Sequence, residues 1–502
     1  MTTARETSRD RYTASVGRIA RGGSLNLLGA GAGAALSLAV TWLVARGASP
    51  TVAGTFFAAT SVFLIASTLA ELGSEVSLAR FLPRFVAQGR IGEAVTCLRA
   101  AVVASLGAGA LVAAGLVLLR HPVEALVGTE PGVEQAVVVL AVFVPVAALL
   151  NTALSATRGL STVRPTVLDK TGRGLLQVAL VGTAVGLGGG IVVLTAAWAV
   201  PYLVAATAAG WWLGVLVRRL ARRERVTARP RAEVLREYTR YTWPRAVAQL
   251  CQIVMQRADI VLVAALRSPA EAAVYTVATR FLVVGQLAVH AIGQVLAPQT
   301  SLLLGAGDRA AAMRLFQTAT TWTMAFTWPL HLATAGSAAL LLEFFGGPAY
   351  LAGVPVVAVL ALAALVSTAC GPVDTMLLMT GRSGLSLVNN VVGLGILIGM
   401  DLFLVPRLGI VGAAVGWAAA IVARNVLGVA QVRRQLAMWP FTRDAVLVAA
   451  AATAALGIPL AVLHWTGHSG AVPSAVTVLG ALAVYFSWLL LASVHGLGRR
   501  GT

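Results

Sequence analysis

Long apolar runs, separated by short groups of Arg, Pro and Gly, occupy almost the whole chain. A helix that crosses a bilayer takes about 20 mostly apolar residues, and the runs are close to that length. We therefore predict an all-α polytopic membrane protein with about fourteen transmembrane helices. The predicted spans are 23–45, 53–76, 98–119, 134–156, 174–188, 191–217, 242–265, 271–297, 316–344, 353–379, 383–405, 408–432, 444–464 and 471–496.

The composition excludes a soluble protein. Of the 502 residues, 58% are hydrophobic and 11% are charged, and the mean hydropathy is +0.84. A soluble chain is about 25% charged, because its surface must face water. A soluble enzyme is therefore excluded.

The positions of the basic residues orient the predicted spans. The chain has a net charge of +19 from 38 basic and 19 acidic residues. With the N-terminus inside, 31 of the 38 basic residues fall in the tails and connections of the cytoplasmic side. Cytoplasmic loops of membrane proteins carry such an excess. We expect cytoplasmic N- and C-termini in a plasma (inner) membrane protein, and no nucleic-acid partner.

Cysteine and histidine give no sign of a metal site. Three cysteines lie far apart without a CxxC spacing, and six histidines are scattered. No disulfide framework, metal or cofactor is predicted.

The chain repeats itself at a shift of 219 residues. Ser49-Pro50 recurs as Ser268-Pro269, and residues 190–192 with Trp198-Ala199 recur as 409–411 with Trp417-Ala418. Each copy holds six spans, and an even number returns the chain to its starting side. Parallel repeats of this kind are typical of transporters.

The repeat predicts the domain organisation. We expect a cytoplasmic N-terminal tail (1–22), an N-lobe with spans 1–6 (23–217), a basic cytoplasmic linker (218–241), a C-lobe with spans 7–12 (242–436), and spans 13–14 with the C-terminal tail (437–502).

Several short motifs carry a family resemblance. They are 42–46, 54–56, 71–73 and 80–84 in the first half, and Asp259 with 274–278, 345–350, 381–382 and 408–414 in the second. These segments resemble the Wzx-type polysaccharide flippases, which transport lipid-linked oligosaccharides and belong to the MOP exporter superfamily with the lipid II flippases and MATE drug exporters. Fourteen spans are more similar to the lipid-linked sugar branch than to the drug exporters, which have twelve.

The resemblance implies a function. It suggests a transporter that flips a pyrophosphate-linked oligosaccharide from the cytoplasmic to the outer leaflet for cell-surface polysaccharide biosynthesis, by alternating access between two lobes. The partners would be the anionic polyprenyl pyrophosphate substrate, membrane lipids, and polysaccharide polymerase or assembly proteins. No catalytic residue is expected.

Polar side chains form a stripe on span seven. Arg245, Gln249, Gln252, Gln256 and Asp259 advance by 4, 3, 4 and 3 residues, which places them within about 80° of one helix face. Span eight has a second stripe, with Thr276, Thr279, Arg280, Gln286, His290 and Gln294. Such stripes either line a cavity or hydrogen-bond neighbouring helices.

Three arginines inside spans are candidate anion ligands. Arg280 lies about ten residues into its predicted span, about 15 Å deep. It either pairs with a carboxylate, Asp259 being the nearest in sequence, or faces a cavity in which it meets a pyrophosphate. Arg257 and Arg424 are weaker candidates, because Arg257 lies about 120° from the centre of the stripe and Arg424 can snorkel.

Buried acids and histidine are candidates for ion coupling. Asp259, His290 and Glu71 could titrate near neutral pH if buried. Asp374 and Asp401 are expected to be solvated charges near helix ends.

Two other functions remain open. A cation-coupled multidrug exporter of the same superfamily would need a negatively charged cavity, against which Arg280 argues. A membrane glycosyltransferase or polymerase would need long outward loops with catalytic groups, and the longest predicted one, 120–133, is short. We therefore do not expect an enzyme.

Overall fold

The computed structural model describes residues 28–160, 162–221, 230–466 and 471–494. Every regular element in this part of the chain is a helix. The predicted tail 1–22, the middle of the predicted linker (222–229) and the last residues (495–502) lie outside the described residues.

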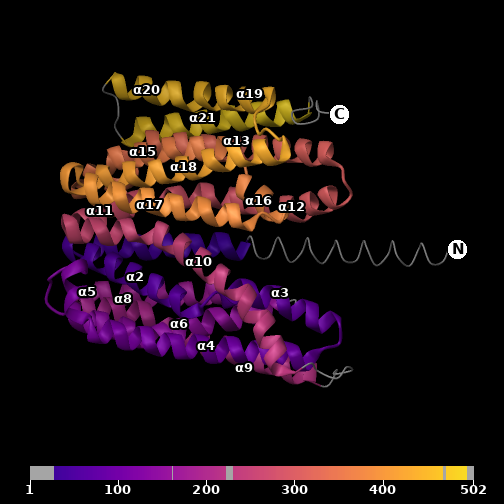
Figure 1. Cartoon of the computed structure of the whole chain (residues 1–502). Helices are drawn as coiled ribbons and strands as arrows, with labels where there is room; N and C mark the ends of the chain where they lie inside the picture. Colours follow the sequence, from indigo (N-terminus) through magenta and orange to yellow (C-terminus); the bar gives the residue numbers. More distant parts are fainter. Residues whose placement is uncertain (1–27, 161, 222–229, 467–470, 495–502) are drawn as a thin grey trace. The chain divides into compact units, whose positions relative to one another are not determined.

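Residue contacts divide the chain into two units, which are described separately (Figure 1). Unit 1 comprises residues up to Val40, Ile65–Arg120 and Gln135–Leu250, and unit 2 comprises Thr41–Leu64, His121–Glu134 and the residues from Cys251. The division passes through the helix Leu28–Gly47, α2 and α10. The predicted lobes are bounded between predicted spans, and their boundaries at 217 and 242 fall within α9 and α10. The lobe boundaries therefore remain a prediction.

Unit 1 is built from helices of 5 to 31 residues. They are α3 (Ser74–Ala87), α4 (Ile91–Leu118), α6 (Val133–Gly159), α7 (Arg164–Leu168), a π-helix (Asp169–Arg173), α8 (Gly174–Gly186) and α9 (Ile191–Ala221). It also holds the first parts of the helix Leu28–Gly47 and of α10 (Arg231–Leu266), and the last part of α2 (Pro50–Glu71).

Unit 2 holds the rest of those three helices together with α5 (Arg120–Val127) and the helices that follow α10. These are α11 (Pro269–Arg280), α12 (Leu282–Gly305), α13 (Arg309–Gly336), α14 (Ala338–Gly346), a 3₁₀-helix (Pro348–Gly353), α15 (Val354–Ala369), α16 (Val373–Met379), α17 (Ser383–Leu408), α18 (Ile410–Leu436), α19 (Arg443–Ala452), a π-helix (Thr453–Gly457), α20 (Ile458–Trp465) and α21 (Ala471–Val494).

Among the described residues, 11 helices are long and apolar enough to cross a membrane, or 13 if two bent pairs each form one span. Thirteen of the fourteen predicted spans have a counterpart there. The predicted span 174–188 is not among these candidates. α8 continues without a break from α7 and the π-helix, and this helical run over 164–186 carries four charged residues in its first ten positions.

The helix boundaries repeat at the shift found in the sequence. α2 begins at Pro50 and α11 at Pro269, while α9 begins at Ile191 and α18 at Ile410. Both pairs of helix starts are 219 residues apart. The duplication therefore extends to the positions at which helices begin.

The two Ser-Pro helix starts have a local cause. Ser268 accepts a hydrogen bond from the amide of Glu271 (3.1 Å), and Ser49 accepts one from the amide of Val52 (3.3 Å). A serine N-cap followed by proline at the first helical position favours a helix start. In unit 2 these helices approach so closely that a Cβ at Gly54 would lie 1.6 Å from the Pro269 carbonyl oxygen. Only glycine fits there.

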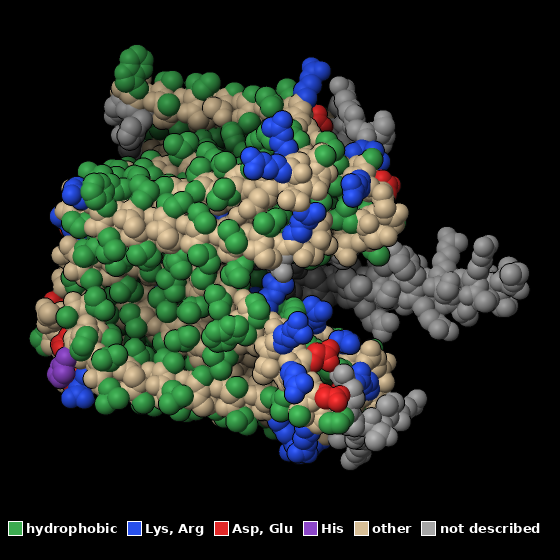
Figure 2. Space-filling model, in the orientation of Figure 1, with side chains coloured by type: hydrophobic (Ala, Val, Ile, Leu, Met, Phe, Trp, Pro, Cys, Tyr) green, Lys and Arg blue, Asp and Glu red, His purple; other side chains and the backbone are tan. Residues whose placement is uncertain are grey.

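Side chains on the surface follow the helix axes. On the face in Figure 2, hydrophobic side chains cover the length of the helices of each unit, and in unit 1 arginines gather over the ends of α3, α9 and α10. This distribution suits helices whose middles lie in lipid and whose ends lie in water.

Candidate functional site

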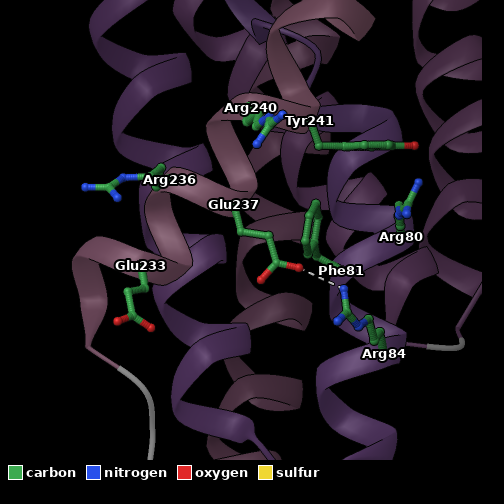
Figure 3. A pocket seen from close by; sticks show the side chains of 8 residues that line it. All are labelled: Arg80, Phe81, Arg84, Glu233, Arg236, Glu237, Arg240 and Tyr241. Carbon is green, nitrogen blue, oxygen red and sulfur yellow. Dashed lines mark hydrogen bonds and ion pairs between the residues drawn. The ribbon is translucent and has the colours of Figure 1, made fainter.

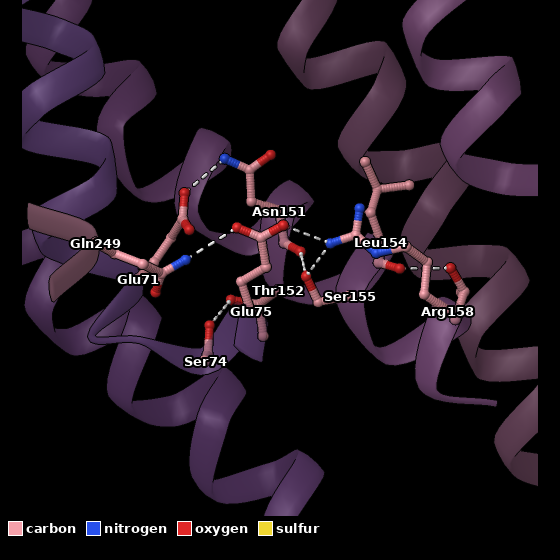
Figure 4. A network of polar contacts seen from close by, with 10 residues as sticks. Glu71, Ser74, Glu75, Asn151, Thr152, Leu154, Ser155, Arg158 and Gln249 are labelled. Carbon is pink, nitrogen blue, oxygen red and sulfur yellow. Dashed lines mark hydrogen bonds and ion pairs between the residues drawn. The ribbon is translucent and has the colours of Figure 1, made fainter. Parts of the chain in front are cut away.

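Unit 1 contains a polar network between α2, α3, α6 and α10 (Figure 4). Asn151 donates a 2.6 Å hydrogen bond to Glu71, a buried carboxylate that is 5% exposed. Arg158 forms a 2.8 Å ion pair with Glu75, and Gln249 donates to the other oxygen of Glu75 at 3.0 Å. The network thus connects one ion-coupling candidate, Glu71, and one cavity candidate, Gln249, through neighbouring helices.

Small hydroxyls extend this network. The Thr152 hydroxyl lies 3.1 Å from the Ser74 hydroxyl and 3.0 Å from the Ser105 hydroxyl, and all three residues are buried. Hydrogen bonds of this kind join helices where no water is present. In this part of unit 1, the polar side chains therefore hydrogen-bond neighbouring helices, which is the second of the two roles considered for such residues.

Unit 2 contains a buried acidic cluster. Asp259 of α10 is 3% exposed, and its carboxylate accepts hydrogen bonds from the Tyr275 hydroxyl (2.7 Å) and from the Ile260 amide (2.8 Å). Asp401 of α17 is completely buried and interacts electrostatically with Asp259. Within the described residues, neither oxygen of Asp401 has a hydrogen-bond partner. We refer to Asp259, Tyr275 and Asp401 as the acidic cluster.

The burial of Asp401 contradicts the sequence-based expectation of a solvated helix-end charge. The predicted span ended at 405, but α17 continues to Leu408, so that Asp401 lies about 10 Å inside the helix end. Its carboxylate also packs against Gly416 of α18, where a Cβ would lie 2.2 Å from Oδ1. Asp374, by contrast, is exposed as expected.

Arg280 is the last residue of α11, at the bend that leads into α12. Its charge interacts with those of Arg257 and Asp259. Among the described residues Arg280 forms no ion pair, and its buried Nε has no hydrogen-bond partner. The oxygens of Asp259 are instead occupied by Tyr275 and a backbone amide.

The remaining span-seven candidates differ in exposure. Gln252 and Gln256 are exposed on α10, while Gln249 and Arg257 are half-buried. Exposed amides on a membrane helix favour a water-accessible surface, because hydrocarbon cannot satisfy their hydrogen bonds.

Arg424 lines a cavity of about 170 Å³ inside unit 2. The cavity lies among α12, α13, α15, α16 and α18, and its polar lining includes Gln286, His331, Asp374 and Asn425. Arg424 donates a 3.3 Å hydrogen bond to Asn390. The structure thus brings Arg424 beside Asp374, and it brings Arg257 and Arg280 beside Asp259. The His290 side chain lies outside the described residues.

Three residues of these clusters are not among the predicted site residues: Asn151, Arg158 and Tyr275. The sequence predicts Asp401 only as a solvated charge, but it is buried. Arg158 lies just beyond the predicted span 134–156, and Ser155 on the same helix face, three residues before it, is a signal that the sequence offers. Nothing in the local pattern around Tyr275 indicates its hydroxyl partner.

Comparison with known families then identifies the chain. The polysaccharide biosynthesis protein family matches residues 19–303, more than half of the sequence. The chain belongs to this family. No curated protein matches it.

Solved structures share the fold of this family member. A lipid II flippase MurJ in an inward closed conformation is 12% identical, with a TM-score of 0.67 over 92% of this chain and 96% of that one. An inward-facing multidrug resistance MATE family transporter of the MOP superfamily is 17% identical, with a TM-score of 0.63 over 80% and 94%. A MOP superfamily transporter from Pyrococcus furiosus is 16% identical, with a TM-score of 0.60 over 84% and 95%.

These comparisons confirm the predicted fold class and the predicted family resemblance. The family member is an all-α, multi-pass membrane protein with the fold of MurJ and the MATE transporters. The family match links it to polysaccharide biosynthesis.

Proposed function

We propose that this transporter flips a pyrophosphate-linked oligosaccharide from the cytoplasmic to the outer leaflet for cell-surface polysaccharide assembly. Two lobes, 23–217 and 242–436, would alternate between inward and outward opening. The lipid tail would stay in the bilayer while the polar headgroup crosses. The family match supports the link to polysaccharide, and the resemblance of the fold to a lipid II flippase supports a lipid-linked substrate.

The observation that carries the proposal is that the Arg280 guanidinium has no ion-pair partner among the described residues. A guanidinium inside a membrane protein is costly unless a partner compensates its charge. Arg280 forms no ion pair within the described part of the chain, and Arg257 adds a second positive charge nearby. Guanidinium groups bind phosphate oxygens in a bidentate manner, which suits a pyrophosphate. Arg424 would assist, and the exposed Gln252 and Gln256 would hydrogen-bond sugar hydroxyls. The predicted role of Gln249 is replaced by its hydrogen bond to Glu75.

We further propose that the acidic cluster carries the coupling cation, proton or sodium. Asp259 and Asp401 are buried close enough for their charges to repel one another, and a bound cation would relieve that repulsion. Glu71 and His290 remain alternative coupling residues.

Arg280→Ala tests the anion site directly. Hydrogen bonds to charged groups contribute about 1.5–3 kcal/mol, so that loss of this side chain should slow flipping roughly tenfold or more. The measurement is translocation of a fluorescent lipid-linked oligosaccharide in vesicles that contain the purified protein. Arg407→Ala, which removes an exposed arginine, is the matched control and should flip at the wild-type rate. Full activity of Arg280→Ala would remove the anion site from the proposal.

A cation-coupled multidrug exporter is the second candidate. The acidic cluster favours it, because buried carboxylates attract cationic drugs as well as coupling ions. A deletion strain distinguishes the two functions. Loss of surface polysaccharide with unchanged drug tolerance would support the flippase, and broad drug sensitivity with intact polysaccharide would support the exporter.

A further inference from the structure

A pocket of about 550 Å³ lies in unit 1, between the end of α3 and the beginning of α10 (Figure 3). None of the residues that line it belongs to the proposed anion site or to the acidic cluster. Its lining contains four arginines, two glutamates and two aromatic residues: Arg80, Phe81, Arg84, Glu233, Arg236, Glu237, Arg240 and Tyr241. At neutral pH these side chains carry a net charge of two positive units.

Contacts within the pocket hold two of the arginines in place. Arg84 forms a 2.8 Å ion pair with Glu237, and the Arg80 guanidinium lies 4.3 Å from the centre of the Tyr241 ring. Phe81 packs edge-on against Tyr241 with the ring centres 5.6 Å apart. A guanidinium stacked on an aromatic ring keeps its edge and its N–H donors available to a ligand.

The other two arginines carry uncompensated charge. Arg236 and Arg240 are exposed on successive turns of α10 and form no ion pair within the described residues. Figure 3 shows Glu237 directed towards Arg84, on the α3 side of the pocket, while Arg240 lies near Tyr241. Glu237 is thus already neutralised by Arg84, and with Glu233 included the lining keeps a net charge of two positive units, which favours an anion.

The position of the pocket along α10 indicates the source of this anion. α10 has 36 residues and is about 54 Å long, whereas the hydrocarbon core is about 30 Å thick. Its first turns therefore project from the core into the headgroup layer. Trp243 is 69% exposed at this level, and tryptophan is enriched where headgroups meet hydrocarbon.

We propose that this pocket binds the phosphate of an anionic phospholipid headgroup from the adjoining leaflet. Arg236 and Arg240 would hold the phosphate from α10, and Arg80 would hold it from α3. The general excess of positive charge on this side explains the presence of arginines, but it does not require four of them around one concave site with a stacked tyrosine. The bound lipid would fasten the beginning of α10 to α3, and the site would serve the protein whichever substrate it transports.

The test uses the full-length protein in nanodiscs of phosphatidylcholine, with or without phosphatidylglycerol. Phosphatidylglycerol should raise the thermal unfolding midpoint of the wild-type protein, and native mass spectrometry should detect retained phosphatidylglycerol. Arg236→Gln with Arg240→Gln should reduce lipid retention several-fold and abolish the shift in midpoint. Inorganic phosphate added to phosphatidylcholine discs should have no effect.

Arg309→Gln with Arg314→Gln is the matched control, because it removes two exposed arginines of unit 2 from the same predicted side. Equal loss of retention in both double variants would overturn the proposal, since charge alone would then explain binding. A midpoint shift with inorganic phosphate equal to that with phosphatidylglycerol would also overturn it, in favour of a free phosphate. If the double variant does not fold, Arg240→Gln alone provides the same comparison, because its side chain is exposed and forms no ion pair within the described residues.

Discussion

At the scale of single residues, Asp401 has an unusual environment for an acidic side chain. Its carboxylate is fully buried and lacks a hydrogen-bond partner within the described residues, while Asp259 is stabilised by Tyr275 and a backbone amide. A buried carboxylate without a partner costs free energy, and such residues in membrane proteins are usually functional. The two carboxylates therefore differ in their surroundings: Asp259 accepts two hydrogen bonds, and Asp401 accepts none within the described residues.

Asp401→Asn separates stability from coupling. Asparagine keeps the size of the side chain and removes its charge, so the thermal unfolding midpoint should stay unchanged or rise. Transport driven by a proton or sodium gradient should fall to the rate without a gradient, because the cation would lose a ligand. The measurements are thermal unfolding in detergent and gradient-driven flipping in vesicles.

Glu343→Gln is the control for this variant, since it neutralises an exposed carboxylate of the same unit. It should leave the unfolding midpoint and gradient-driven flipping unchanged. Wild-type gradient dependence in Asp401→Asn would place the coupling cation elsewhere, with Glu71 as the next candidate.

At the scale of helices, the close approach of α2 and α11 explains a glycine that the sequence alone does not. Both helices begin with the same Ser-Pro pair, but Gly54 corresponds to Ala273 at the 219-residue shift. A side chain at Gly54 would meet the Pro269 carbonyl, whereas Gly107 of α4 has open space around it. Both repeats have the same helix start, but only the first has a glycine at this position, where the Pro269 carbonyl leaves no room for a side chain.

Gly54→Ala should destabilise the protein. Overpacking of a close contact typically costs about 1–3 kcal/mol, and here the obstacle is backbone, which cannot rotate away. Gly107→Ala should be neutral or slightly stabilising, because alanine favours helix and nothing lies in its way. Thermal unfolding of the purified variants gives the comparison, and equal midpoints for both would contradict the close approach.

At the scale of the whole molecule, the distribution of arginines predicts the orientation in the membrane. The predicted cytoplasmic side includes the connection between α12 and α13, and the opposite side includes the connection between α8 and α9. Cys97, Cys251 and Cys370 are buried, so that added cysteines can be labelled selectively.

Cysteine labelling tests this orientation. A membrane-impermeant maleimide should label Gly190→Cys in intact cells, because residue 190 is exposed between α8 and α9. It should label Ala306→Cys, between α12 and α13, only after the cells are permeabilised. The reverse pattern would invert the predicted topology, and labelling of both in intact cells would mean that the predicted number of crossings between these two positions is wrong.

The sequence by itself determined the fold class, thirteen of the membrane spans and the duplication. These depend on the amount of apolar surface and on local helix starts such as Ser268-Pro269, which are written in neighbouring residues. The tertiary structure decided the environment of each polar group. The sequence predicts Asp401 as a helix-end charge. In the structure it is buried, because α17 extends to Leu408 and the Asp401 carboxylate packs against Gly416. Tyr275 reaches Asp259 from another helix, and no pattern along one helix reports a partner that packing supplies.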